Sequence, residues 1–79
     1  MKLPRDLSGT DLVQALSRSW AYQKVHQSGS HIILQTETPF PHRIAVPAHA
    51  VLRLGTLNAI LRAVAAHKGV GREDILKSL

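Results

Sequence analysis

The sequence predicts an α+β fold in which helices cover one face of a three-stranded antiparallel sheet. Apolar residues recur at helical spacing near both ends of the chain, and three short runs of strand-forming residues lie between them, separated by turn residues. A small domain of this class usually leaves the other sheet face open to solvent. The chain has 79 residues, which suffice for one domain only, so residues 1–79 are expected to form a single domain.

A capping signal predicts the first helix. Ser8 is followed three residues later by Asp11, and the apolar residues after it recur at helical spacing. We expect this helix to run from about Gly9 to Arg18. An isolated helix this short is marginal in water, so its apolar stripe must be buried against the rest of the chain.

The next two runs predict a β-hairpin. Residues 22–27 mostly alternate in polarity and are partly aromatic or β-branched, and residues 31–36 form a more apolar run. Ser28, Gly29 and Ser30, which separate the two runs, are typical turn residues.

The remaining elements follow from similar signals. A second turn over residues 37–41 leads into a strand over 42–46, which Pro47 ends because proline has no N–H for the ladder. Apolar residues then return to helical spacing and predict a helix over about 55–67. A last short helix over 72–79 carries acidic residues in its first turn, where they suit the helix dipole.

The net charge of +5 is unevenly distributed along the chain. Between Leu12 and Arg72 the only acidic residue is Glu37. This imbalance favours a polyanionic ligand such as a nucleic acid. A basic surface that only serves solubility, and a surface that meets an acidic protein, fit the same charge.

Three absences limit the class of protein. The chain has no cysteine, so it holds neither a disulfide framework nor a thiolate metal site. No apolar run approaches the roughly 20 residues that span a bilayer, and the stretch from Met1 to Asp6 lacks the hydrophobic segment of a secretory signal. We therefore expect a soluble cytoplasmic protein without a membrane partner.

His31 directly follows the predicted turn and begins the central strand. Histidine is the side chain that gains and loses a proton near neutral pH, which suits it to acid–base catalysis. A strand that starts after a glycine-containing turn positions a side chain better than a flexible loop does. By position alone, His31 is either a catalytic residue or a residue that completes the turn.

The other histidines have simpler interpretations. His26, His42 and His67 flank or end elements and are interpreted as solvated surface residues, and His49 lies in a loop where it forms hydrogen bonds or helps to bind phosphate. The chain has no Cys/His pairs and no helical His-x-x-x-His, which are the strong zinc patterns. Phosphate-binding loops, nucleotide-binding fingerprints and the Gly-x-Ser-x-Gly elbow are also missing, so we expect no metal and no cofactor.

Several ordered segments of the chain carry a family resemblance. They are Gly9-Thr10-Asp11-Leu12, Val25-His26-Gln27-Ser28-Gly29-Ser30-His31, Arg43-Ile44-Ala45-Val46-Pro47-Ala48-His49 and Leu54-Gly55-Thr56-Leu57-Asn58-Ala59-Ile60-Leu61-Arg62. With these segments the whole chain resembles the HicA family of toxin mRNA interferases, small proteins with a double-stranded-RNA-binding-domain-like fold. Only about the last dozen residues, including the segment 65–71, depart from the family pattern.

The resemblance implies a function. It implies that His31 is the catalytic residue of a metal-independent endoribonuclease and that Gly29 and Ser30 shape the turn that holds it. It also implies that the protein cuts mRNA, arrests translation and growth, and is silenced by a HicB-type antitoxin encoded beside it.

The chemistry of RNA cleavage suggests roles for further residues. RNA carries its own nucleophile in the 2′-hydroxyl, so an enzyme removes that proton, neutralises the developing charge and protonates the leaving oxygen. His31 serves as base or acid, and Lys24 and Arg43 on the neighbouring strands are candidates for charge stabilisation. Ser28 joins the turn as a candidate substrate contact. The sequence reveals no second acid or base.

Unpaired RNA bases also need surfaces on which to stack. Trp20, Tyr22 and Phe40 are the aromatic candidates, and Trp20, which lies beside the end of the first helix, is expected to pack in the core. We expect a single-stranded substrate that is held mainly by its phosphates.

Two other classes of function remain open at this point. One is a non-catalytic RNA- or DNA-binding module in which His31 only completes the turn. The other is an interaction protein whose basic face meets an acidic partner.

Overall fold

Six elements follow one another in the computed structural model, which describes residues 3–79. In chain order they are α1 (Gly9–Ser19), β1 (Gln23–Ser28), β2 (His31–Thr36), β3 (His42–Pro47), α2 (Leu54–Lys68) and α3 (Arg72–Lys77). The predicted α+β class and the order of helix, three strands, helix and short helix are confirmed. Met1 and Lys2, which belong to the N-terminal stretch considered above, lie outside the described residues.

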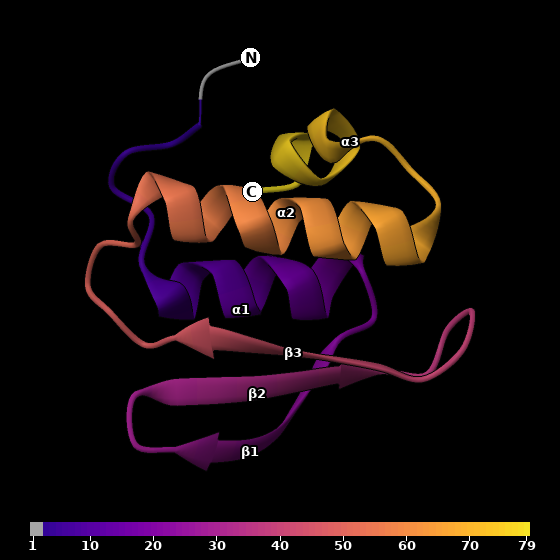
Figure 1. Ribbon diagram of the computed structural model, residues 1–79, viewed down its shortest axis with the longest axis horizontal. Helices are drawn as coiled ribbons and strands as arrows, with labels where there is room; N and C mark the ends of the chain where they lie inside the picture. The colour runs from indigo at the N-terminus through magenta and orange to yellow at the C-terminus, as the bar shows by residue number, and fades with distance from the viewer. Residues whose placement is uncertain (1–2) are drawn as a thin grey trace.

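The three strands form one antiparallel sheet with β2 in the centre. Figure 1 shows three layers: the sheet, then α1 and α2, and then α3 on the far side of α2. The pairing of β1 with β2 shifts between Lys24 and His26, so Val25 forms a bulge in this edge strand. A bulge twists an exposed edge and makes it a poorer template for another strand.

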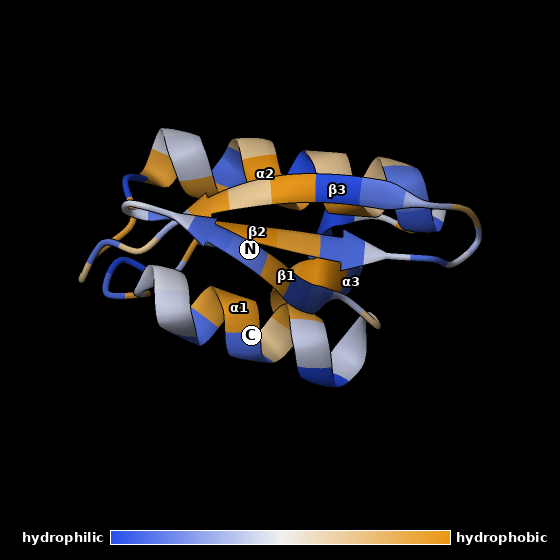
Figure 2. Cartoon of the chain, turned by 90° about the horizontal axis from the view of Figure 1, so that it is seen from below, coloured by the Kyte–Doolittle hydropathy of each residue, from blue (hydrophilic) through white to orange (hydrophobic). Residues whose placement is uncertain are grey.

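The two faces of the sheet differ sharply along β2. Ile32, Leu34 and Thr36 are buried toward the helices, whereas His31 is exposed on the opposite face. Figure 2 views the molecule from below, with the strands in front of α1 and α2. The prediction of one covered and one open face is confirmed.

The core lies between the sheet and the two longer helices. It consists of buried side chains from every layer, namely Leu12, Leu16, Tyr22, Ile32, Leu34, Val46, Leu52, Leu57, Ile60, Leu61, Val64, Ala65, Ile75 and Leu76. Burying an aliphatic side chain contributes about 1.5–3 kcal/mol, and this apolar set therefore provides most of the stabilisation of so small a domain.

The ends of the helices follow the sequence signals. Ser8 Oγ accepts the Asp11 N–H at 3.0 Å, and Asp11 Oδ2 accepts the Ser8 N–H at 3.4 Å, which completes the predicted capping box. Gly69 ends α2 with φ +69°, a left-handed conformation that favours glycine. The predicted bounds differ from the observed ones by one or two residues, the usual uncertainty at an element's end.

Among residues 3–79, no helix combines the length and the apolar character that are needed to cross a membrane.

Candidate active site

The turn between β1 and β2 is tightly defined. Ser28 and His31 are cross-strand partners, so only Gly29 and Ser30 lie between the strands. Gly29 has φ +58°, which a residue with a side chain rarely adopts. Gln27 Nε2 donates to the Gly29 carbonyl at 3.2 Å. We call residues 28–31 the His31 turn.

The backbone of His31 is held on both sides. It pairs with Ser28 of β1 and with Pro47 of β3, because β2 is the central strand. Its side chain is exposed on the open face of the sheet. His31 therefore combines a fixed backbone with an imidazole that a large ligand can reach.

The start of α1 supports this turn from behind. The Ala48 N–H donates to the Ser30 carbonyl, and the Gly9 N–H donates to the His49 carbonyl at 2.9 Å. A Cβ atom on Gly9 would lie 1.9 Å from the Pro47 carbonyl oxygen. The chain therefore packs backbone against backbone from α1, through residues 47–49, to the His31 turn.

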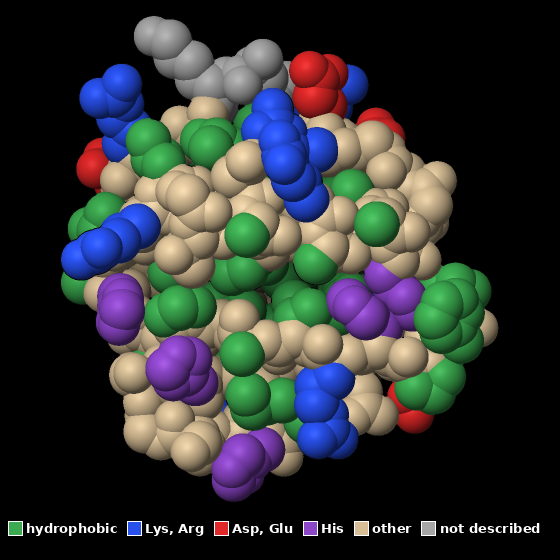
Figure 3. Space-filling model, in the orientation of Figure 1, with side chains coloured by type: hydrophobic (Ala, Val, Ile, Leu, Met, Phe, Trp, Pro, Cys, Tyr) green, Lys and Arg blue, Asp and Glu red, His purple; other side chains and the backbone are tan. Residues whose placement is uncertain are grey.

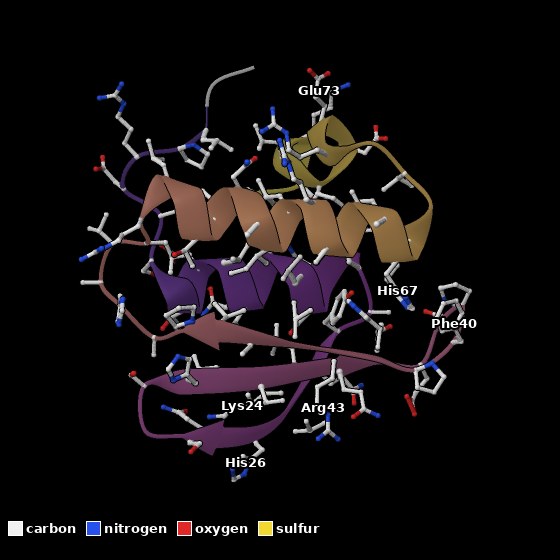
Figure 4. The ribbon with its side chains drawn as sticks, viewed as in Figure 1. Lys24, His26, Phe40, Arg43, His67 and Glu73 are labelled. Carbon is white, nitrogen blue, oxygen red and sulfur yellow. The ribbon has the colours of Figure 1, made fainter. Side chains whose placement is uncertain are left out.

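His26 is the second ionisable side chain on this part of the open face. It pairs with Ile33, two residues along β2 from His31, and so lies diagonally across from His31 on the same face. Diagonal neighbours in a sheet are about 7–8 Å apart. Figure 4 shows His26 projecting from β1, away from the helices.

The two basic candidates are not adjacent to His31. Lys24 pairs with Leu34, which puts it on the other face of the sheet, and its Nζ donates to Gln27 Oε1 at 2.9 Å. Arg43 pairs with Gln35, on the same face as His31 but four residues along β2, or about 13 Å at 3.3 Å per residue. Its Nε and Nη2 both donate to Gln35 Oε1, at 2.9 and 2.6 Å.

A second cluster of side chains lies at the other end of the sheet, and sequence reasoning missed it. The Tyr22 hydroxyl lies 2.9 Å from His42 Nδ1, and the His42 ring stacks on His67 with centroids 4.2 Å apart and planes at 16°. Phe40 meets His67 edge to face, with centroids 4.6 Å apart and planes at 81°. The interpretation of His42 and His67 as solvated residues is wrong, because both are half-buried.

Lys68 completes this cluster by fixing the loop between β2 and β3. Its Nζ donates to Thr36 Oγ1 at 2.9 Å, to the Thr38 carbonyl at 2.7 Å and to Thr38 Oγ1 at 3.1 Å. It also lies 5.2 Å from the centre of the Tyr22 ring. We call Tyr22, Phe40, His42, His67 and Lys68 the distal cluster.

Burial and like charge act on the ionisable groups of the distal cluster. The pKa of His42 is lowered by its burial and by the nearby His67 and Lys68. Burial also lowers the pKa of Lys68 and raises the pKa of Tyr22. Each shift favours the neutral form of its group. No sequence signal marks this cluster, because its members come from three separate parts of the chain, residue 22, residues 40–42 and residues 67–68.

Histidines thus gather at two ends of the sheet. Figure 3 shows purple side chains in two groups on one face, and acidic side chains only near the margin of that view. Within residues 3–79, no three His, Cys, Asp or Glu side chains are placed to hold a metal ion. An exposed imidazole on a rigid turn can exchange a proton with a bound anionic polymer.

Comparisons of the chain with protein-family models, with curated proteins and with solved structures found no match.

Proposed function

We propose that the chain is a metal-independent endoribonuclease of the HicA type that cleaves mRNA, with His31 as its catalytic residue. The observation that carries the proposal is the exposed imidazole of His31 on a turn that both neighbouring strands and the start of α1 support. The net charge of +5 and the family resemblance of the same segments point in the same direction. The protein acts in the cytoplasm, where its substrate is found.

The proposed reaction uses the nucleophile within the substrate. The 2′-oxygen of the ribose forms a bond to the adjacent phosphorus, and the bond from that phosphorus to the leaving 5′-oxygen breaks. The 2′-hydroxyl proton leaves to a base, and an acid protonates the leaving oxygen. His31 performs one of these two transfers, and no metal or cofactor takes part.

His26 is our candidate for the other transfer. It is exposed on the same sheet face and lies diagonally across from His31. Diagonal positions in a sheet are about 7–8 Å apart, so a phosphate group bound to this face lies within reach of both side chains. His26 follows a bulge, a feature that often redirects side chains beside active sites.

Arg43 and Lys24 have different roles in the proposed binding of RNA. Arg43, on the same face as His31, is about 13 Å away along the strands, so it binds a phosphate next to the scissile one. Lys24 lies on the other face of the edge strand, where it attracts the polymer without reaching the scissile phosphate. Ser28, Gly29 and Ser30 offer the substrate the surface of the turn itself.

Cleavage of an unstructured RNA in the presence of a chelator tests the proposal. His31→Ala should slow cleavage about 10²–10⁴-fold, the usual contribution of a general acid or base, with folding and RNA affinity kept. His26→Gln should slow cleavage with the same pattern. Parent and variants are purified identically, so that a contaminating nuclease would show equal rates in all of them. Undiminished cleavage by His31→Ala would remove His31 from the mechanism, and RNA binding without any cleavage would identify a binding module instead.

The proposed regulator is a HicB-type antitoxin that covers His31 and the basic face. Covering an exposed residue blocks the substrate without a change of conformation. Adding the antitoxin should stop cleavage and shift the imidazole NMR signals of His31. An inhibited complex in which the His31 signals are unchanged would contradict this mode of inhibition.

A further inference from the structure

Only one of the three large aromatic side chains is free to meet a ligand. Tyr22 is fully buried, and Trp20 is half-buried, with its Nε1 donating to Ser78 Oγ at 2.8 Å. Phe40, in contrast, is 61% exposed. Burying a phenylalanine side chain is favourable by about 1.5–3 kcal/mol, so the exposure of this ring in a loop calls for an explanation.

The exposed ring is held in a defined position. Its edge-to-face contact with His67 continues through the His67–His42 stack to the buried Tyr22 hydroxyl. The flanking residues Pro39 and Pro41 restrict the backbone on both sides. Phe40 is therefore a preorganised ring rather than a side chain on a flexible loop.

The loop itself is fixed to the end of α2. Lys68 Nζ donates to Thr36 and Thr38, and His67 Nε2 donates to the Thr38 carbonyl at 3.2 Å. Because the three donors of the ammonium group are occupied within the protein, Lys68 contributes its positive charge to the surface but no further hydrogen bond.

The charge around Phe40 selects an anionic partner. The basic side chains Lys68 and Arg43 lie near this end of the sheet, and the one acidic residue of the same loop, Glu37, accepts a hydrogen bond from Gln35 Nε2 at 3.0 Å. In Figure 4, Arg43 lies between His26, which projects from β1, and the pair of Phe40 and His67 at one end of the sheet.

We propose that Phe40 is a stacking platform for an unpaired base of single-stranded RNA whose backbone runs along the sheet between the distal cluster and the His31 turn. The inference rests on the proposed function in that the RNA held here is the one cut at His31. The two sites are separated by the length of β2, six residues or about 20 Å, so they contact different nucleotides of one strand. An aromatic platform accepts any base, because every base has a π face, and it adds affinity without sequence preference.

The test measures binding of a short unstructured RNA by fluorescence anisotropy, in a His31→Ala background that prevents cleavage. Phe40→Ala should weaken binding about tenfold, whereas Phe40→Tyr should keep the parent affinity because the ring remains. An abasic RNA of the same length should bind Phe40→Ala and its parent equally. Val51→Ala is the matched control, since Val51 is also an exposed apolar side chain, at 54%, and lies outside the proposed contacts. Thermal unfolding of each variant establishes that it is folded.

Each outcome decides the proposal separately from the nuclease activity. If Phe40→Ala binds ordinary RNA as tightly as its parent does, Phe40 is not a stacking platform. The same conclusion follows if Phe40→Ala lowers the affinity for ordinary RNA and for abasic RNA by the same factor. If Phe40→Ala instead abolishes self-association seen by sedimentation and leaves RNA affinity unchanged, the ring belongs to a protein interface and the proposal is overturned. If Phe40→Ala shows the expected loss of binding but the protein with His31 intact never cleaves RNA, the platform stands and the ribonuclease proposal fails.

Discussion

Gly9 shows how one missing side chain supports the candidate site. The space that its Cβ would need is occupied by the Pro47 carbonyl oxygen, at 1.9 Å, and by other backbone atoms of Pro47 and Ala48. Backbone atoms cannot move aside as the end of a flexible side chain can. Because Ala48 also binds the Ser30 carbonyl, a displacement at Gly9 would be transmitted to the His31 turn.

Gly9→Ala should therefore lower both stability and RNA cleavage. Overpacking of this kind typically costs about 1–3 kcal/mol, and we expect the free energy of unfolding to fall by that amount in chemical denaturation. Gly55→Ala is the matched control, because a Cβ at this position of α2 meets nothing within 4 Å and alanine is the better helix former. Equal effects of the two substitutions would show that the close approach at Gly9 is unimportant.

At the scale of elements, the distal cluster joins the end of α2 to the loop between β2 and β3. Lys68 and His67 bind the loop at Thr38, and His42 at the start of β3 stacks on His67. The groups that face His42 are His67 and Lys68 of α2 and the neutral Tyr22 hydroxyl. Among residues 3–79, no acidic side chain forms a hydrogen bond to a member of this cluster. A proton added to His42 is therefore opposed by nearby positive charge that no carboxylate neutralises.

The cluster predicts that stability falls in mild acid. The pKa of His42 is lowered from 6.5 in the folded protein by burial, His67 and Lys68, whereas the unfolded chain takes up this proton near pH 6.5. The unfolded state therefore binds more protons below that pH. The contribution of neutral His42 to stability is complete above about pH 6.5 and is lost as the pH falls through the lower folded-state pKa.

The free energy of unfolding, measured from pH 8 to pH 4 by denaturant titration at fixed salt, checks this expectation. His42→Gln removes the titrating ring but keeps an acceptor for the Tyr22 hydroxyl, so its stability should depend less on pH over the same range. The same acid-induced decline in parent and variant would assign the effect to other groups.

At the scale of the whole molecule, the acidic residues lie mostly away from the sheet. Asp11 and Asp74 each accept a backbone N–H at a helix start, and Glu73 lies in the first turn of α3. The three layers put α3 on the side of α2 that faces away from the sheet. The charged side chains within the three strands are Lys24 and Arg43, both basic, so the sheet along which RNA is proposed to bind carries positive charge and no acidic residue.

RNA binding should then weaken steeply with salt. For single strands the logarithm of the association constant falls by about 0.7 per phosphate contact for each tenfold rise in salt, and we expect a slope steeper than about −2, equivalent to three or more contacts. Arg43→Gln should make the slope shallower by about 0.7, because it removes one contact. Lys77→Gln at the end of α3 removes the same charge on the far layer and should leave the slope unchanged. A slope near zero in the parent would contradict recognition through phosphates.

The local elements were predictable because their signals lie within a few residues of one another. Ser8 and Asp11 form the predicted capping box, and Gly29, at φ +58°, lies in the turn that was predicted between the two strands. The bulge at Val25 was not predictable, because it follows from how β1 pairs with β2 and not from the composition of β1 itself. Pro47 remains the last residue of β3, one residue beyond the predicted strand.

By itself, the sequence determined the α+β class, the order of the six elements, the basic charge and the position of His31 at the start of the central strand, because periodicity, capping and turn chemistry act over short distances along the chain. Only the tertiary structure decided which groups share a face: it separated Lys24 from His31, set Arg43 about 13 Å along the sheet and gathered the distal cluster from three parts of the chain. The physical reason is that strand register and helix docking are fixed by the burial of a common core, and a one-residue shift in register would reverse the face of every side chain.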